Sequence, residues 1–266
     1  MFPLDAPVFP ASAEELAASL ESGLRRLFRV DRPGPIVRVT GGTWPALERV
    51  IVDLAGAELV TAEPPPRPGG NHRQPGFFVR DWRVSAPGVR RGGVTGDLEL
   101  TAQDLRLDYD LDERGRTLLV PAGAGQGRLG AATSLRDLEA LLLSGARAGA
   151  AEHGVSIENV ALELEPIDAR AVRVAARVEA RKVVRVDVRV TGRLAVDEEL
   201  HATLSNLECG GTGLVGSMVA GLVRRHLAPF EGRRVPLQAF ALGDVRVRDV
   251  KLAVQDGIEV TASFSG

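Results

Sequence analysis

Hydrophobic and polar positions alternate from Val172 to Val196. Every even-numbered position in this run is apolar except Lys182 and Gly192, and most odd positions carry a charge. A period of two indicates β-strands with one apolar and one polar face, and valine suits such a pleated surface. A single strand would be roughly 80 Å long at about 3.3 Å per residue, which is far beyond the usual length. We therefore predict two strands joined by a turn near 181–183, with one long, bent strand as the alternative.

Three segments have the spacing of amphipathic helices. The first begins at the cap residue Ser12 and ends before the Pro-Gly-rich breaker at 31–35. The second follows a cap at Thr133 or Ser134 and continues to about residue 153. The third spans 214–228, because Pro229 ends it. These helices are separated by long stretches that show strand periodicity.

The remaining pattern predicts strands that follow one another directly. They are expected at 36–40, 49–54, 77–85, 94–102, 105–111, 117–120, 155–165 and 200–207, with a C-terminal hairpin, 244–254 and 258–264, around Asp256-Gly257. Loops are expected at 63–76, which is rich in proline, and at 123–130, which is rich in glycine. Because β-α-β alternation is absent, the chain is predicted to be α+β with an antiparallel sheet.

Composition excludes several classes of protein. The chain has 266 residues and a net charge of -2, so it lacks the basic footprint of a nucleic-acid-binding domain. Its one cysteine, Cys209, excludes an internal disulfide framework, and its four histidines have no metal-ligand spacing. We expect no cofactor and no metal. The start lacks the basic and apolar regions of a signal peptide, and no apolar stretch is long enough to span a bilayer. A soluble, cytoplasmic protein is expected, unless a leader has been removed.

The segment 211–216 matches the pattern GxGxxG and opens a predicted helix. In dinucleotide-binding folds such glycines let a backbone approach a pyrophosphate. The preceding strand is half polar, however, and no further β-α-β unit follows. The sequence therefore favours a strand-to-helix linker over a nucleotide site.

A row of arginines occupies one face of the alternating run. Its members are Arg173, Arg177, Arg181, Arg185, Arg189 and Arg193. Such a row could hold the phosphate groups of lipids or nucleic acid. We favour a solvated face on which Glu163 and Glu165 of the preceding strand supply ion-pair partners. The face lacks the aromatic residues that stack on single-stranded nucleic acid.

The sequence gives little support for catalysis. It contains no nucleophile elbow and no kinase signature, so we predict that the chain is not an enzyme. Asp108, Asp110, Asp112 and Glu113 form an acidic cluster near a turn, where a divalent ion is conceivable. Alternating strand positions that end in a turn explain this cluster more simply, because the ligand spacing of a calcium loop is absent.

The order of the elements resembles the tubular lipid-binding superfamily, and within it the small bacterial phospholipid-binding members. The resemblance is carried by 94–100 with 105–107, by 134–142, by the alternating valine strands, and by the closing segments 235–247 and 256–260. It implies a strongly curved antiparallel sheet wrapped around one or more long helices, with an apolar groove for a lipid. On this basis we expect an N-terminal helix and linker at 1–34 and a single lipid-binding-like domain at 35–266.

The resulting hypothesis is binding or transfer of a phospholipid or other acyl-chain ligand without covalent chemistry. The predicted lining consists of Leu138, Leu141, Leu142, Val184, Val186, Val188, Val190, Leu214, Met218 and Leu222. Arg185 and Arg189 are candidates for headgroup contact. Peripheral membrane contact and homo-oligomers are compatible with this hypothesis. The alternative is a scaffold with a solid core that recruits protein partners through sheet edges or helix faces, because interiors normally pack densely.

Overall fold

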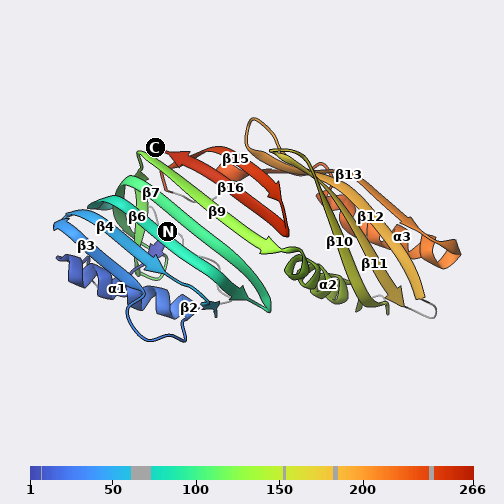
Figure 1. Cartoon of the computed structure of the whole chain (residues 1–266), viewed down its shortest axis with the longest axis horizontal. Helices are drawn as coiled ribbons and strands as arrows, with labels where there is room; N and C mark the ends of the chain where they lie inside the picture. Colours follow the sequence, from blue (N-terminus) through green and yellow to red (C-terminus); the bar gives the residue numbers. More distant parts are fainter. Residues whose placement is uncertain (7, 61–72, 152–153, 182–184, 240–242) are drawn as a thin grey trace. The chain divides into compact units, whose positions relative to one another are not determined.

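The structure is a computed structural model, and it describes residues 1–266 apart from 7, 61–72, 152–153, 182–184 and 240–242. Figure 1 shows the whole chain. The helices are α1 (Ala13–Leu27), α2 (Leu135–Ala151) and α3 (Gly213–Leu227), with short 3₁₀ turns η1 (Ala228–Phe230) and η2 (Leu237–Ala239). The strands are β1 (Phe2–Pro3), β2 (Phe28–Arg29), β3 (Val37–Thr43), β4 (Ala46–Asp53), β5 (Glu58–Leu59), β6 (Gln74–Arg91), β7 (Val94–Leu111), β8 (Thr117–Gly123), β9 (Gln126–Ser134), β10 (Ser156–Asp168), β11 (Ala171–Arg181), β12 (Arg185–Val196), β13 (His201–Gly211), β14 (Arg234–Pro236), β15 (Arg246–Val254) and β16 (Gly257–Ser265).

The fold is mostly β, with 60% of the residues in strands and 20% in helices. The predicted class, α+β with a curved sheet wrapped around long helices, is therefore wrong. The reason is length. The α-helices of the described part have 15, 17 and 15 residues, whereas β6 and β7 have 18 residues each. At about 1.5 Å per helical residue and 3.3 Å per strand residue, no such helix is long enough to serve as an axis for these strands.

The chain forms two compact units. The first contains residues 1–131, 238–249 and 261–266, and the second contains 132–237 and 250–260. The boundary falls within β9, β15 and β16. In the described part of the chain, the strands form an 11-stranded sheet, whose main path is β15-β16-β9-β7-β6-β4-β3, and a 5-stranded sheet, β10-β11-β12-β13-β14.

The long strands of the first unit continue through two positions at which the sequence pattern indicated the end of a strand. Pro87-Gly88 follows the strand predicted at 77–85, but it lies inside β6, where the pairing with β7 shifts register between Ala86 and Val89. Gly88 tolerates this bulge with a φ of +66°. The two strands predicted at 94–102 and 105–111 are one strand, β7. Hydrogen bonding to β6 continues on both sides of Asp104, so pairing with a neighbour overrides the local signal.

Two predicted loops have different outcomes. The glycine-rich segment 123–130 is largely strand, because β9 begins at Gln126 and lies between β7 and β16 in the sheet. The prediction of a flexible connection there is wrong. The proline-rich loop at 63–76 falls mostly outside the described residues, and the chain is strand β6 from Gln74 onward.

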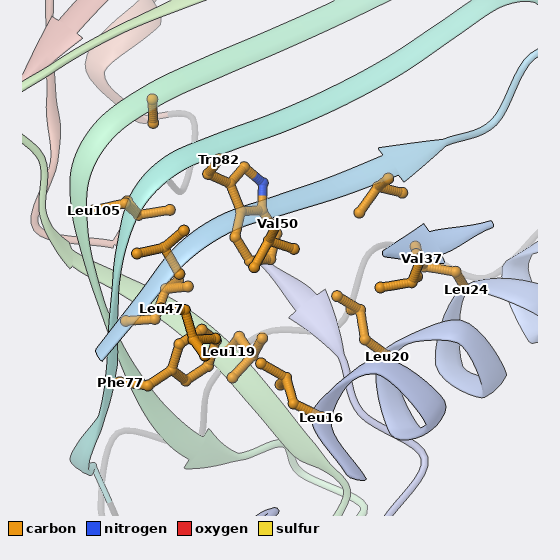
Figure 2. Close-up of a cluster of buried hydrophobic side chains, with 14 of the residues drawn as sticks. Leu16, Leu20, Leu24, Val37, Leu47, Val50, Phe77, Trp82, Leu105 and Leu119 are labelled. Carbon is orange, nitrogen blue, oxygen red and sulfur yellow. The ribbon is translucent and has the colours of Figure 1, made fainter. Parts of the chain in front are cut away.

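Helix α1 packs on the sheet of the first unit. Its N-cap is Ser12, whose side chain accepts a hydrogen bond from the Glu15 backbone N–H at 3.2 Å, which confirms the predicted start. The stripe of Leu16, Leu20 and Leu24 is buried. Figure 2 shows these leucines turned toward side chains of β4, β6 and β8, with Trp82 in the same cluster. This cluster is the hydrophobic core of the first unit.

The C-terminal hairpin is confirmed, because β15 and β16 are neighbours in the sheet on either side of Gln255-Asp256. Within the second unit, the carbonyl of Asp256 accepts a hydrogen bond from the Leu135 N–H at 3.0 Å. The turn therefore satisfies a free N–H in the first turn of α2. Among the residues that the structure describes, no helix is both long enough and apolar enough to cross a membrane.

Candidate functional site

The alternating run forms the centre of the sheet in the second unit. β11 ends at Arg181, β12 begins at Arg185, and these two residues are cross-strand partners. Two antiparallel strands are therefore confirmed, while the connection at 182–184 lies outside the described residues. Alternation gives the sheet two unlike faces. We call the side of the even-numbered residues of β11 and β12 the helix face, and the opposite side the charged face.

Both helices of this unit pack on the helix face. Helix α2 packs along β10, and α3 packs on β12 and β13 (Figure 1). Val219 of α3 belongs to the same buried cluster as Val186 and Val188 of β12, and Ala146 of α2 packs against that cluster. The main contacts of α2 are with β10, and those of α3 are with β13 and β12. β11 lies between β10, on which α2 packs, and β12, on which α3 packs. The two helices therefore cover the helix face of β11 only in part.

Helix α2 also protects the open edge of the sheet. The Leu162 backbone N–H donates to Glu139 Oε1 at 2.8 Å, and Arg147 Nε donates to the Ile157 carbonyl at 2.9 Å. β10 is the last strand on this side, so these backbone groups face away from the sheet. An edge occupied by side chains is a poor template for another strand. This arrangement disfavours partner recruitment through this part of β10.

The GxGxxG segment is the junction between β13 and α3. A Cβ atom on Gly211 would lie 2.1 Å from the Gly216 carbonyl oxygen. The first and last glycines of the pattern are thus required because the strand end and the first helical turn approach each other closely. The preceding strand is antiparallel to its neighbours. This geometry agrees with the strand-to-helix linker that the sequence favoured.

The predicted lipid-lining residues lie in three different environments. Val186 and Val188 are buried beneath the helices, whereas Leu138 and Val190 are half-buried. Leu141 is 54% exposed, Leu142 is 44% exposed and Met218 is 77% exposed. Val184 lies outside the described residues, as do the side chains of Leu214 and Leu222. The described members therefore do not line one common cavity.

A set of half-buried aliphatic residues remains on the helix face. We call these residues the aliphatic strip: Leu164, Val174, Ala176, Val178 and Val190. Cross-strand pairing places Leu164 opposite Val174, and Ala176 opposite Val190. The alternation in the sequence correctly assigned three of these residues, Val174, Ala176 and Val178, to the apolar face of the sheet. Periodicity alone does not show which apolar positions a helix covers.

The charged face carries arginines in directly opposed pairs. These pairs are Arg173 with Arg193, Arg177 with Arg189, and Arg181 with Arg185. Carboxylates engage one member of the first two pairs, because Glu165 binds Arg173 at 2.6 Å and Asp187 binds Arg177 at 2.8 Å. In the third pair both members have a partner, because Glu179 binds Arg185 and Glu158 lies 3.9 Å from Arg181. The hydrogen bond to Asp187 raises the pKa of the Arg177 guanidinium. Ion pairs across strands were predicted, and Glu165 supplies one as expected.

Arg189 and Arg193 differ from the other arginines of the row. Within the described residues, neither side chain has a hydrogen bond or an ion pair, and the same is true of the Glu163 side chain. The two predicted headgroup candidates therefore differ in their ion pairs. Arg185 forms ion pairs with Glu179 and Glu158, whereas Arg189 forms none within the described residues. Both lie on the face opposite the aliphatic strip.

An open groove with a volume of about 580 Å³ lies along the charged face. Its lining consists of Ala161, Glu163, Ala175, Ala176, Arg177, Asp187, Val188, Arg189, Gly210, Gly211 and Thr212. Cross-strand pairing places Ala161 beside Arg177, and Gly210 beside Arg189. The two arginines are thus flanked by small residues that leave room at the surface. Sequence reasoning missed this groove because it depends on the register of four strands.

An acidic cluster lies where β12 turns into β13. Asp197, Glu199 and His201 place one potential ligand atom each within 4.8 Å of one another. The hydrogen bond from the His201 backbone N–H and the nearby Arg234 together lower the pKa of Asp197 to about 2. Burial acts in the opposite direction but is outweighed. Arg234 also binds Glu199 at 2.8 Å. Because a guanidinium already occupies both carboxylates, we interpret the cluster as an ion-pair network that holds the hairpin.

The acidic cluster around Asp112 is a turn. Asp112 Oδ1 accepts hydrogen bonds from the backbone N–H groups of Arg114 at 2.9 Å and Arg116 at 2.8 Å, and Oδ2 accepts from Arg116 Nε at 2.7 Å. Asp108 instead binds Arg73 at 2.8 Å. Burial alone would raise the pKa of Asp112, but the hydrogen bonds outweigh it and the pKa is lowered.

Replacing Asp112 by alanine is expected to lower the free energy of unfolding by about 2–3 kcal/mol, because three hydrogen bonds to a buried carboxylate are lost. The lowered pKa means that the ionised form stabilises the fold. This contribution is complete above the unfolded pKa of about 3.9 and is lost as the pH falls through the lower folded value. Urea unfolding of both proteins between pH 6 and pH 2.5 should show a difference that shrinks below about pH 4. A constant difference would contradict this role.

Comparison of the chain with protein-family models, with curated proteins and with solved structures finds no match. Function is therefore inferred from the residues of the chain and their geometry. Two surfaces of the second unit stand out on that basis. They are the aliphatic strip on the helix face and the groove on the charged face.

Proposed function

We propose that the chain binds a lipid through an acyl chain that lies along the aliphatic strip, without covalent chemistry. The observation that carries this proposal is the incomplete cover of β11. Helices α2 and α3 pack on the strands to either side, yet Val174 and Ala176 stay half-buried between them. Val178 is also half-buried and packs against the buried cluster beneath the helices. An acyl chain along β11 would remove this aliphatic surface from water.

The flank of α2 that is turned away from the sheet edge favours the same ligand. Arg147 reaches the outer edge of β10, which fixes the rotation of the helix. At about 100° per residue, Leu138 and Leu142 lie on the opposite flank. Leu138 is half-buried and Leu142 is exposed. Both leucines are therefore available to extend the aliphatic strip from the helix side.

The chemistry of the strip suits a hydrocarbon chain. Its side chains are all aliphatic, so they offer no hydrogen-bond partner that would select a polar ligand. Burying a methylene group contributes about 0.8 kcal/mol, so a chain of about twelve carbons could contribute roughly 10 kcal/mol before the cost of immobilisation. Micromolar affinity corresponds to about 8 kcal/mol. The resemblance to tubular lipid-binding proteins stays a prediction, and it points to the same class of ligand.

The lining proposed here is narrower than the one that the sequence suggested. Leu141 and Met218 lie about 200° around their helices from Leu143 and Ala220, which pack on the core, so they face away from the sheet. Arg185 and Arg189 lie on the other face and are not proposed to contact the headgroup of this lipid. The polar end of the lipid is expected in solvent, at one end of the strip.

Two neighbouring alanines of β11 provide a matched test. Ala176 belongs to the aliphatic strip, whereas Ala175 lies on the charged face, and both are half-buried. We expect Ala176→Gln to raise the Kd for dansyl-undecanoic acid about tenfold, because an unpaired amide would be buried beside the chain. Ala175→Gln should leave the Kd unchanged within about twofold. Fluorescence titration of the 266-residue chain measures both Kd values.

Native mass spectrometry of freshly purified protein gives an independent check. Co-purified lipid near one molecule per chain supports the proposal, and its loss in Ala176→Gln supports the location. Equal weakening by both substitutions, or no probe binding by a folded protein, would contradict it. A second copy of the chain on the strip would appear as a stable dimer that Ala176→Gln dissociates. That result would favour the scaffold alternative.

A further inference from the structure

Arg177 and Arg189 form an opposed pair inside the groove of the charged face. They are cross-strand partners on β11 and β12, and both line the groove. Like charges in directly opposite positions destabilise a sheet. Asp187 offsets one charge through its 2.8 Å hydrogen bond with Arg177. In the described part of the chain, no carboxylate offsets the charge of Arg189.

The neighbours of this pair leave space for a ligand. In order across the sheet, the row reads Ala161, Arg177, Arg189 and Gly210. Side chains of one carbon or none therefore flank both guanidinium groups, and the groove is open above them. A planar guanidinium in such a position can form two parallel hydrogen bonds with a phosphate or a carboxylate.

The carboxylate of Glu163, on the β10 side of the groove, favours a ligand that also carries a positive charge. Glu163 of β10 lines the groove, and its side chain has no hydrogen bond or ion pair among the described residues. It is paired across the sheet with Ala175, whose small side chain separates it from β12. β10 and β12 are two strands apart, or about 10 Å. A small molecule with an anionic end and a cationic end would bridge the side chains that extend into the groove from these two strands.

We propose that this groove binds a small zwitterion, with its phosphate or carboxylate on Arg189 and Arg177 and its ammonium group on Glu163. Ala176 belongs to both the groove lining and the aliphatic strip. The charged groups proposed here, Arg177, Arg189 and Glu163, are not part of the strip, so the site does not depend on the lipid proposal. A nucleic acid fits less well, since the groove offers no aromatic side chain for stacking and has a carboxylate at each side. The ammonium distinguishes the proposed ligand from a simple anion.

Calorimetric titration of the 266-residue chain at low ionic strength tests the proposal. The probes are O-phosphoethanolamine, inorganic phosphate and ethanolamine. We expect O-phosphoethanolamine to bind at least tenfold more tightly than either of the others, because it engages both ends of the groove. Glu163→Gln should remove this advantage over phosphate. Equal binding of phosphate and O-phosphoethanolamine, or no binding of either, would overturn the assignment.

The arginine row supplies a matched control. Arg193 lies on the same face of β12, is opposed to another arginine, and has no partner among the described residues, but it is outside the groove. Arg189→Gln should weaken O-phosphoethanolamine binding at least tenfold, whereas Arg193→Gln should change it by less than twofold. Equal effects would show a general response to surface charge and would overturn the site. Circular dichroism confirms that each variant is folded.

Vesicles distinguish a free zwitterion from a lipid headgroup. Phosphatidylcholine vesicles with and without phosphatidylethanolamine are sedimented with the protein and with Arg189→Gln. We expect no recruitment by phosphatidylethanolamine that depends on Arg189, which identifies the ligand as a free small molecule. Recruitment that does depend on Arg189 also supports the groove and assigns the zwitterion to a headgroup. Tighter binding of a single-stranded oligonucleotide than of O-phosphoethanolamine, lost in Arg189→Gln, would overturn the ligand class.

Discussion

Replacing Trp82 by alanine is expected to lower the free energy of unfolding by roughly 3–5 kcal/mol, which is the usual cost of truncating a buried aromatic residue. Trp82 is fully buried in the core of the first unit (Figure 2). It lies beside Val50 of β4 and Ala102 of β7, and its ring centroid is 5.0 Å from that of Phe2. The cavity would therefore be shared by several strands and by the N-terminal segment. Urea unfolding followed by circular dichroism measures the loss.

Trp82→Phe is the matched control for this prediction. The indole Nε1 of Trp82 is buried and has no hydrogen-bond partner among the described residues. An unsatisfied buried donor costs about 1–3 kcal/mol, so phenylalanine removes that penalty while it loses part of the packing. We expect a net change within about 1.5 kcal/mol. If Trp82→Phe is as destabilising as Trp82→Ala, the indole N–H has a partner, such as a buried water molecule.

Much of the local structure could be predicted from the sequence because its signals are short in range. The alternation from Val172 to Val196 gave two antiparallel strands, and the parity correctly separated Val188 from Arg189. The cap at Ser12 gave the start of α1 to the residue. Asp256-Gly257 gave the closing hairpin. Each of these features depends on neighbours within a few positions along the chain.

The errors concern features that depend on distant partners. Residues 123–130 contain several glycines, and they form a strand because β7 and β16 lie on either side of β9. The curved sheet around a long helix was implied by a resemblance in the order of elements. Order does not fix how far each strand extends, and β6 and β7 continue through Gly88 and Asp104 to a length that no helix of the described chain matches.

The candidate sites show the same limit. Sequence alternation places Val174 and Ala176 on one side with Val186 and Val188, but only the packing of α2 and α3 shows which of them stay accessible. The arginine row was visible in the sequence. The opposed position of Arg177 and Arg189 was not visible, because it depends on the register between β11 and β12.

Substitution by asparagine is expected to affect stability very differently on the two faces of β12. Val188 is fully buried in the cluster beneath α2 and α3, whereas the adjacent Arg189 is exposed. We expect Val188→Asn to lower the free energy of unfolding by roughly 3–5 kcal/mol, because it removes apolar packing and buries an amide without a partner. Arg189→Asn should change stability by less than about 0.5 kcal/mol, as is usual for surface positions.

Urea unfolding of the two variants measures the contrast, and binding of O-phosphoethanolamine separates stability from function. Arg189→Asn should keep the stability of the parent protein while it loses the proposed ligand, because its side chain contributes to the groove and not to the core. Val188→Asn should instead lower the stability, and it is not used as a binding control because Val188 also lines the groove. If Arg189→Asn is the more destabilising of the two, the strand has the opposite face toward the helices. Both the aliphatic strip and the groove would then be wrongly placed.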